Sequence, residues 1–380
     1  MPAITIRPVI TSKDLEAFLG FPRRVYASDP NWVPPLVSEQ AKRLDQTKNP
    51  HFGHARLQMF LAQRNGDLVG TISATINQRR NDHLGVADGY FGFFECIEDP
   101  DVATVLIDTA IDFCRDCGMT MVKGPINLDE SEELGVLVHG FDSRPAVLLS
   151  HSRPYYAEYL ERLGFIKWYD TRAWMLTRDD IGGSLENLPR KLFAAAERVR
   201  QRDRVTVRPL DTRHWDDEVH RLYEMWNVTI AQVNRSFVPI EKAELKHMVD
   251  GMRQVVDPDL VRVAEAPDPS RPSGRRPVGF AVALPDVNQI LRKADGRLYP
   301  FGWAKLMWHS RRIDALTFKL LGVIPEFRHR GIEGAMMLDV VRAAWDKGYK
   351  TCTWVEKGSA PLDLGLARCT RRYRMYQRPI

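Results

Sequence analysis

The feature that most constrains this chain is that its two halves begin with the same pattern. The pattern of residues 3–20 predicts a short strand, a turn and a helix, and residues 205–226 show the same pattern. Each predicted strand contains an Arg-Pro step. Apolar residues alternate along each strand and then recur at helical spacing. A period of about 200 residues is too long for a stacked solenoid, so the pattern predicts a tandem duplication of one domain.

The likeness continues along both halves. Each half next shows two strands joined by a turn, then a strand, an amphipathic helix that ends near a glycine, and one further strand. These segments are residues 57–63, 68–75, 90–96, 101–117 and 119–126 in the first half and 260–266, 278–284, 313–324, 331–347 and 349–356 in the second. We therefore expect a first domain over residues 1–180, a helical connector over 181–204 and a second domain over 205–380.

Composition excludes several classes of protein. The 380 residues are 44% hydrophobic and 27% charged, with a net charge of +5. This is the balance of a folded globular chain, and the charge is well short of the basic excess of a nucleic-acid-binding domain. No apolar run reaches the ~18 residues of a membrane span, and the N-terminus lacks the order of a signal peptide. Five sparse cysteines indicate a reducing compartment, so we expect a cytoplasmic protein. Cys114 and Cys117 form a CxxC, but no second pair or nearby histidine completes a zinc site, so we expect no metal site.

The segment of residues 321–337 carries the most chemical information. A strand ends at Val323, a proline breaks it, and a basic cluster leads to Gly331, which opens a helix. The first backbone N–H groups of a helix are unpaired, and the helix dipole adds partial positive charge there. Gly331 lets the backbone approach a ligand closely, while Arg328 and Arg330 add full positive charge. The junction therefore predicts a binding site for phosphate groups.

This junction resembles the pyrophosphate loop of the GCN5-related N-acetyltransferase (GNAT) superfamily. The matching residues are Arg-His-Arg-Gly-Ile-Glu at 328–333, preceded by Gly-Val-Ile-Pro at 322–325. Glu333 stands where the superfamily has glycine or alanine. The resemblance implies that an acyl-CoA, such as acetyl-CoA, binds as co-substrate. The residues that it implies for coenzyme binding are Leu321, Gly322, Val323, Arg328, His329, Arg330, Gly331, Ile332, Gly334 and Ala335.

A second resemblance lies in the first half, where YYAEYLERLGF at residues 155–165 is similar to the closing helix of the same fold. The whole chain also resembles a family of bacterial tandem-GNAT proteins. The shared features are FGFFE ending at Glu95, GPIN at 124–127, GVLVHGFD at 135–142, PDVNQ at 285–289 and RRYRMYQRP at 371–379. The resemblance implies an α/β (α+β) fold of two tandem GNAT-like domains, each a central mixed, mostly antiparallel sheet flanked by helices.

The two halves differ at the loop that would hold the coenzyme. In the first half the corresponding residues 95–101 contain four acids and no glycine. Negative charge at a helix N-terminus stabilises the helix but repels a diphosphate. We therefore expect that the first half has lost the coenzyme site and that the second half binds the acyl donor.

The resemblance implies direct transfer of an acyl group from a thioester to an amine. Such a reaction uses a general base, and in this superfamily a tyrosine often protonates the departing thiolate. The candidates are Tyr373 and Tyr376 as the acid, Glu356 and Glu95 as the base, and Asp286 and Asn288 as ligands of the acceptor.

The function expected from the sequence is that of an acyl-CoA-dependent N-acyltransferase with a small-molecule amine acceptor. Two alternatives stay open. In one, the donor is an acyl carrier protein, whose phosphopantetheine arm lacks the nucleotide that Glu333 would disfavour. In the other, the chain is a non-catalytic tandem protein that binds a ligand or a protein partner.

Overall fold

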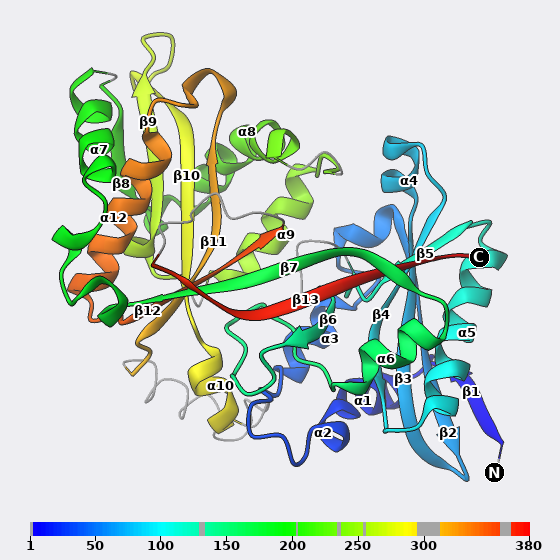
Figure 1. The fold of residues 1–380 in the computed structure, drawn as a ribbon. Coiled ribbons are helices and arrows are strands. Elements are labelled where there is room, and N and C mark those ends of the chain that lie inside the picture. The colour runs from blue at the N-terminus through cyan, green and yellow to red at the C-terminus, as the bar shows by residue number, and fades with distance from the viewer. Residues whose placement is uncertain are drawn as a thin grey trace.

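The computed structural model describes residues 3–128, 134–202, 204–233, 237–253, 256–294, 312–357 and 366–380. Strands and helices alternate through both halves, as Figure 1 shows. The elements of the first half are β1 (Ile4–Pro8), α1 (Ser12–Gly20), α2 (Pro22–Val25), α3 (Val37–Arg43), the 3₁₀ turn η1 (Pro50–Gly53), β2 (Ala55–Arg64), β3 (Asp67–Asn77), α4 (Gln78–Leu84), β4 (Asp88–Cys96), α5 (Pro100–Asp116), β5 (Met121–Gly124), β6 (Val136–His139), α6 (Tyr155–Arg162) and β7 (Ile166–Thr177).

The second half follows the same order. Its elements are α7 (Arg190–Arg202), β8 (Thr206–Pro209), α8 (Trp215–Val233), α9 (Lys242–Met252), β9 (Val261–Pro267), β10 (Arg275–Pro285), α10 (Asn288–Ala294), β11 (Ala315–Val323), the 3₁₀ turn η6 (Pro325–Phe327), α12 (Ile332–Asp346), β12 (Thr351–Lys357) and β13 (Arg368–Pro379). None of the helices in the described ranges combines the length and the apolar character needed to cross a bilayer.

The strands form one continuous mixed sheet. Its order is β1-β2-β3-β4-β5-β13-β7-β12-β11-β10-β9-β8, and the short β6 pairs with β13. The parallel pairs among the described strands are β4 with β5 and β11 with β12, and the other pairs are antiparallel. The mixed, mostly antiparallel sheet is therefore as expected, but the two halves share it.

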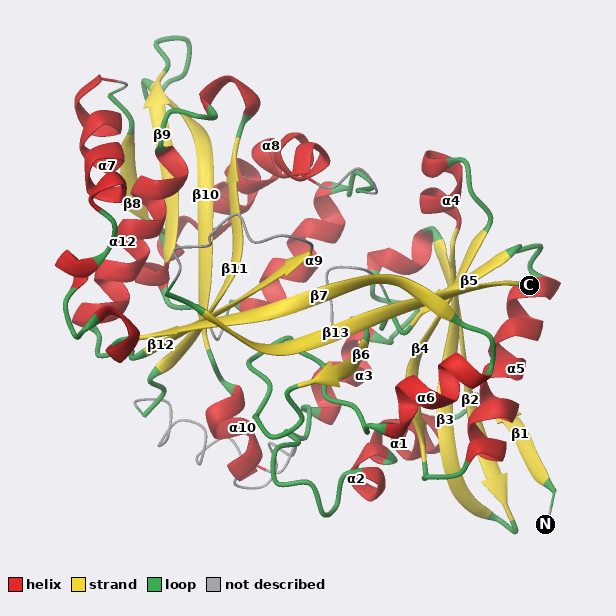
Figure 2. Ribbon diagram, in the orientation of Figure 1, coloured by secondary structure: helices red, strands yellow, loops and turns green. Residues whose placement is uncertain are grey.

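The two halves are joined by the long strands β7 and β13, which cross the middle of the molecule side by side (Figure 2). Trp174 of β7 lies opposite Cys369 of β13 on one side and Trp354 of β12 on the other. The end of β13 pairs with β5, with Tyr376 opposite Gly124. Strand β13 therefore pairs with strands of the first half, although it belongs to the second half of the sequence. The two halves of the sequence are thus not two separate sheets.

Each half has its own main core beneath one long helix. Leu106 and Ile107 of α5 are fully buried against the strands of the first half, and Met336 of α12 is buried against Phe280 in the second. Asp99 caps α5 by accepting the backbone N–H of Asp101. Burying a large apolar side chain stabilises a fold by about 1.5–3 kcal/mol, so these two helices fix the strands on which the sites lie.

Candidate active site

The parallel strands β11 and β12 of the second half separate before β11 ends. They pair only from Ala315 opposite Thr351 to Phe318 opposite Trp354, whereas β11 continues to Val323. Ile324 donates its N–H to Val278 O over 2.9 Å, on the side of β10. Backbone groups alternate between the two edges of a strand. The groups of Leu321 and Val323 therefore face the gap between the strands, where an extended ligand could add to the edge.

A turn with left-handed backbone follows β11 and leads into α12. His329 has a φ of 59° and Gly331 a φ of 94°, and α12 begins at Ile332. No side chain caps α12, so the N–H groups of its first turn are available to a ligand. The N-terminus of this helix therefore has the geometry of a phosphate site.

The two arginines of this turn have different contacts. Arg328 donates through Nε to Val323 O over 3.0 Å and through a terminal nitrogen to Thr229 O over 3.2 Å. It thereby ties α8 to the end of β11. Arg330 is exposed, donates to Glu326 O over 2.7 Å and lies 4.7 Å from the centre of the Phe327 ring. Of the two guanidinium groups, that of Arg330 is the better placed to approach a ligand from solvent.

The remaining residues predicted to bind the coenzyme lie in the same place. Gly322 is in β11, where an added Cβ would lie 2.3 Å from Cγ2 of Thr229, so only glycine fits. Ile332 and Ala335 are buried beneath the first turn of α12. Glu333 is half-buried in that turn, and Gly334 faces Leu192 of α7. The structure thus brings the predicted set together around one turn.

Glu356 lies at the end of β12, beside the point where β11 and β12 separate. The residue is 8% exposed, and its Oε1 accepts the indole N–H of Trp354 over 3.0 Å. Its Oε2 is buried and has no hydrogen-bond partner among the described residues. A buried carboxylate oxygen without a partner is costly unless a ligand or water satisfies it. The role of Glu356 as a general base stays a prediction.

The corresponding gap in the first half is filled by the chain itself. β4 and β5 pair only from Asp88 to Tyr90 of β4, and Phe93 then has a φ of 45°. Ile126 donates its N–H to Phe91 O over 2.8 Å, and Oδ1 of Asn127 accepts the N–H of Phe93 over 2.7 Å. These contacts occupy the edge of β4 that a ligand would need. The residues after β5 therefore close this slot, whereas none of residues 312–357 and 366–380 closes the one between β11 and β12 by a backbone hydrogen bond.

The helix N-terminus in the first half is also satisfied internally. Asp99 caps α5 and accepts a charged hydrogen bond from Arg64 over 2.6 Å. Burial acts to raise the pKa of Asp99, but the bonds from Arg64 and from the Asp101 N–H outweigh it, so the pKa is lowered. The carboxylate stays charged at the place where a diphosphate would have to bind.

A cavity of about 270 Å³ lies where the first half meets the second, between the segment from α1 to α3, β4 and α10. Its walls are largely apolar and include Phe18, Trp32, Leu36, Phe93, Leu149 and Leu291. Its polar groups include Thr71, Glu95, Asn127, His151 and Asn288. Glu95 accepts a hydrogen bond of 2.6 Å from Tyr156, and burial followed by the charge of Glu95 raises the pKa of Tyr156 well above its usual value.

A network of buried polar side chains, which we did not predict from the sequence, includes His151 of the cavity wall. Arg371 of β13 is 2% exposed and donates to Nδ1 of His151 over 2.7 Å and to Ser143 O. His151 in turn bonds Asp29 through Nε2 over 2.9 Å. Because an arginine can only donate, His151 is neutral with its proton on Nε2. Burial lowers the pKa of His151, with a further contribution from Arg371, which agrees with this state.

Two proteins of known sequence resemble the chain over most of its length. Protein YghO of Escherichia coli (strain K12) is 31% identical over 387 residues, which cover 99% of this chain and 95% of YghO. The bacterial ceramide synthase of Caulobacter vibrioides is 36% identical over 328 residues, 86% of this chain and 82% of that protein. A tandem GNAT protein from the clavulanic acid biosynthesis pathway superposes with a TM-score of 0.58 at 11% identity, over 99% of this chain and 98% of its own.

The chain belongs to the tandem-GNAT family. The expected fold of two GNAT-like halves is therefore confirmed, together with the resemblance on which it rested. No protein-family model matches the chain. The solved structure supports the fold alone, because its sequence identity is low.

The two tyrosine candidates lie on β13, which the sheet order separates from β11 by β7 and β12. Tyr376 is buried beside β5 and donates to Glu161 over 2.9 Å, and burial followed by Glu161 raises its pKa. Tyr373 is also buried, and it lies in register with Thr171 of β7 and Lys357 of β12. Adjacent strands lie about 4.8 Å apart, so the backbone of Tyr373 is about 10 Å from the end of β12.

The two residues predicted to bind the acceptor tie the halves together. Asp286 accepts the N–H of Val147 over 2.8 Å, and Asn288 donates to Pro145 O over 3.1 Å. Both are buried, and burial raises the pKa of Asp286 to about 6. Asn288 also lines the cavity, whereas Asp286 holds the loop at Val147, another residue of the cavity wall. The role of these residues in acceptor binding stays a prediction.

Proposed function

We propose that this protein is an N-acyltransferase that joins a fatty acyl group, carried as a thioester, to the amine of a long-chain amphipathic acceptor. The observation that carries the proposal is the contrast between the halves. Within the described residues, the gap between β11 and β12 is unfilled and lies beside an uncapped helix N-terminus, whereas the equivalent gap in the first half is filled by Ile126 and Asn127. The donor therefore belongs to the second half.

The donor would extend from the phosphate turn along the free edge of β11. Its diphosphate would accept hydrogen bonds from the first N–H groups of α12, with Arg330 supplying positive charge. Its pantetheine amides would pair with backbone groups of Leu321 and with the N–H of Val323, whose carbonyl oxygen already accepts a hydrogen bond from Arg328. The thioester then lies near the point where β11 and β12 meet, on the side of Glu356.

The reaction would proceed by direct attack of the amine. The amine nitrogen forms a bond to the thioester carbon, and the carbon–sulfur bond breaks as the thiolate leaves. Glu356 takes the proton that the nitrogen loses, through the carboxylate oxygen that has no partner among the described residues. We assign protonation of the thiolate to Tyr373, the nearer of the two tyrosine candidates by strand register.

The long-chain character of the substrate is supported by two observations. The relative from Caulobacter is named as a ceramide synthase, and a ceramide is an amide of a fatty acid with a long-chain amino alcohol. The cavity is lined by many apolar side chains together with polar groups such as Glu95 and His151. Ligand sites of this kind are mostly apolar with a few polar groups that fix orientation. We assign the cavity to an alkyl chain of a substrate.

A variant that fills the cavity tests this assignment. Leu291→Trp adds bulk to the cavity wall, and Ile10→Trp, at an 81% exposed position, is the matched control. We expect Leu291→Trp to lower kcat/KM for long-chain substrates by about 10-fold or more while short-chain substrates keep their rate, since kcat/KM reports transition-state binding. Equal losses for long and short chains would contradict the assignment of the cavity.

A second candidate donor is an acyl carrier protein. It is favoured by Arg328, whose guanidinium bonds Val323 O and Thr229 O, and by Glu333, which adds negative charge to the phosphate turn. A phosphopantetheine arm carries one phosphate and no nucleotide, so the turn has fewer negative charges to bind. Comparing matched acyl-CoA and acyl-carrier-protein donors decides between them. A steep fall in rate with added salt for the carrier alone would support a charged docking surface.

A further inference from the structure

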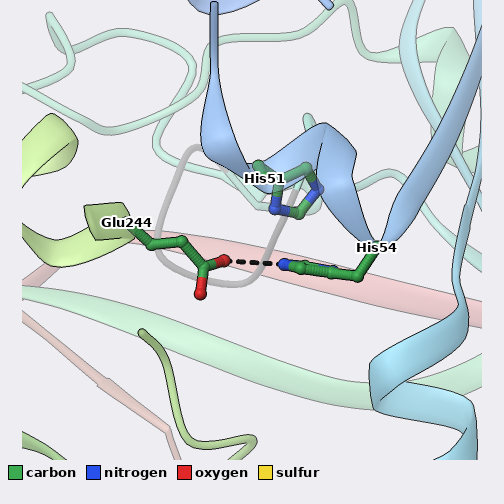
Figure 3. A group of neighbouring side chains, drawn as sticks. All are labelled: His51, His54 and Glu244. Carbon is green, nitrogen blue, oxygen red and sulfur yellow. Dashed lines mark hydrogen bonds and ion pairs between the residues drawn. The ribbon is translucent and has the colours of Figure 1, made fainter. Parts of the chain in front are cut away.

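Three side chains with metal-binding groups meet where the first half touches the second. His51 lies in the turn η1, His54 directly follows this turn, and Glu244 lies in the first turn of α9. One ligand atom from each lies within 4.8 Å of the other two. Figure 3 shows a ring nitrogen of His51 above the contact between His54 and Glu244. Elements from both halves thus direct nitrogen and oxygen atoms to one point.

The hydrogen bonds of His54 restrict what can lie between it and Glu244. Oδ1 of Asn77 accepts the backbone N–H of Arg80 over 3.0 Å, so its contact of 3.2 Å with Nδ1 of His54 places a proton on Nδ1. A neutral His54 then presents a lone pair at Nε2, only 2.7 Å from Oε1 of Glu244. Two lone pairs at this distance repel each other. A cation must therefore lie between them, either a second ring proton or a metal ion.

The carboxylate of Glu244 is held in a fixed orientation. Arg79 donates to both of its oxygens, over 2.7 and 2.8 Å, and the N–H of Glu241 donates to Oε2 over 2.8 Å. Oε1 keeps one lone pair directed at His54. The two hydrogen bonds from the Arg79 guanidinium stabilise the negative charge of this carboxylate. The group is therefore an ionised ligand at neutral pH.

We propose that His51, His54 and Glu244 bind a divalent transition-metal ion of the zinc class, which joins the two halves. Two imidazoles and a carboxylate are a ligand set that zinc takes, with a fourth position left for water. Ligands at about 2.0–2.1 Å from a tetrahedral ion lie about 3.3 Å apart. This separation falls between the 2.7 Å and the 4.8 Å found here, so small side-chain movements suffice.

Two further features favour an ion over a proton. A proton between His54 and Glu244 would bind only these two residues, whereas a metal ion could also bind the ring nitrogen of His51, which lies at the same place. The bond from Nδ1 of His54 to Asn77 is the type of outer contact that fixes the tautomer of a metal-binding histidine. The positive charge of Arg79 opposes the ion, so we expect weaker binding than at a similar site without an arginine.

The test uses the full chain, freed of metal with a chelator and then titrated with Zn²⁺ or Co²⁺. We expect about one ion per chain, and we expect bound Co²⁺ to show the intense visible absorption of a tetrahedral site. His54→Ala and Glu244→Gln should weaken binding at least 10-fold. Asn77→Ala should weaken it by about 10–100-fold, because it removes the outer contact. His247→Ala, at an exposed position on the same helix, should leave binding unchanged.

The spectrum of the unaltered chain with Co²⁺ keeps the test valid if a variant does not fold. A chain that takes up no ion from excess Zn²⁺ or Co²⁺ would overturn the proposal. So would His54→Ala that binds the ion as tightly as the unaltered chain. In either case the contact is an imidazolium–carboxylate ion pair.

Discussion

The backbone N–H of Ile126 donates to the carbonyl oxygen of Phe91 over 2.8 Å, across the gap where β4 and β5 of the first half separate. In the second half no such contact spans the gap between β11 and β12 in the described residues. Among the residues that the structure describes, the gap is thus filled in the first copy and unfilled in the second. The proposed function rests on this difference, because an extended donor needs a free strand edge.

Gly92→Ala tests how tightly the closed gap is packed. A Cβ at this position would lie 2.1 Å from the carbonyl oxygen of Ile126. Ile126 and Asn127, which form the plug of the gap, must therefore move. We expect a loss of about 1–3 kcal/mol in the free energy of unfolding, measured with urea. Gly251→Ala is the control, since nothing lies within 4 Å of the added carbon and alanine favours the helix. Equal stability of Gly92→Ala and the unaltered chain would show that the plug is loose.

Glu356→Gln tests the proposed base. Glutamine keeps an acceptor for the Trp354 N–H but cannot take a proton, so we expect kcat to fall by about 10²–10⁴-fold while donor affinity is kept. Steady-state rates and donor titrations measure the two effects separately. Glu95→Gln is the comparison, and we expect a smaller loss of kcat. A larger loss from Glu95→Gln would move the proton transfer to the cavity of the first half.

Glu333→Gln tests the electrostatics of the phosphate turn. The carboxylate lies in the first turn of α12, where it repels the phosphates of a donor. Removing one charge about 5 Å away is worth about 1 kcal/mol at the surface, which is about fivefold in Kd. We expect tighter binding of acyl-CoA in the variant, with a gain that shrinks as salt rises. Unchanged affinity at low salt would show that Glu333 points away from the donor.

Asp286→Asn tests the buried carboxylate behind the cavity. Its folded-state pKa of about 6 lies above the ordinary value of 3.8, chiefly because of burial. The folded state therefore binds this proton more tightly, and the contribution to stability is lost as pH rises from about 4 to about 6. Asparagine keeps the acceptor for the Val147 N–H without the charge. We expect the variant to gain about 2 kcal/mol relative to the unaltered chain between pH 4 and pH 7, measured by urea unfolding at each pH. A constant difference would contradict the raised pKa.

Much of the fold could be read from the sequence because the signals are local. Gly331 and the apolar spacing of α12 predicted the turn and the helix at their observed positions, and the tandem arrangement followed from the repeat. The position of β13 between β5 and β7 could not be predicted, because strand pairing depends on contacts between residues far apart in the chain. Residues 371–379 entered the sequence analysis only as a feature shared with the family. The alternation of Tyr373 and Met375 with arginines is a local signal for the observed strand, but it does not identify the neighbouring strands.

The site was predictable only in part, for the same reason. Residues 321–335 are contiguous and could be grouped by motif. The plug formed by Asn127 and the buried contact between Arg371 and His151 join residues far apart in sequence. The expectation that the chain has no metal site rested on its cysteines, whereas the group around Glu244 combines the two halves.

The central claim is that the donor binds the second half, and hydrogen exchange of the full chain with a saturating, non-reactive CoA thioester analogue tests it most directly. Backbone N–H groups at a phosphate site become protected when the ligand binds. The account predicts slowed exchange in residues 321–336 and no change in residues 91–105. Protection of residues 91–105 without protection of residues 321–336 would contradict it.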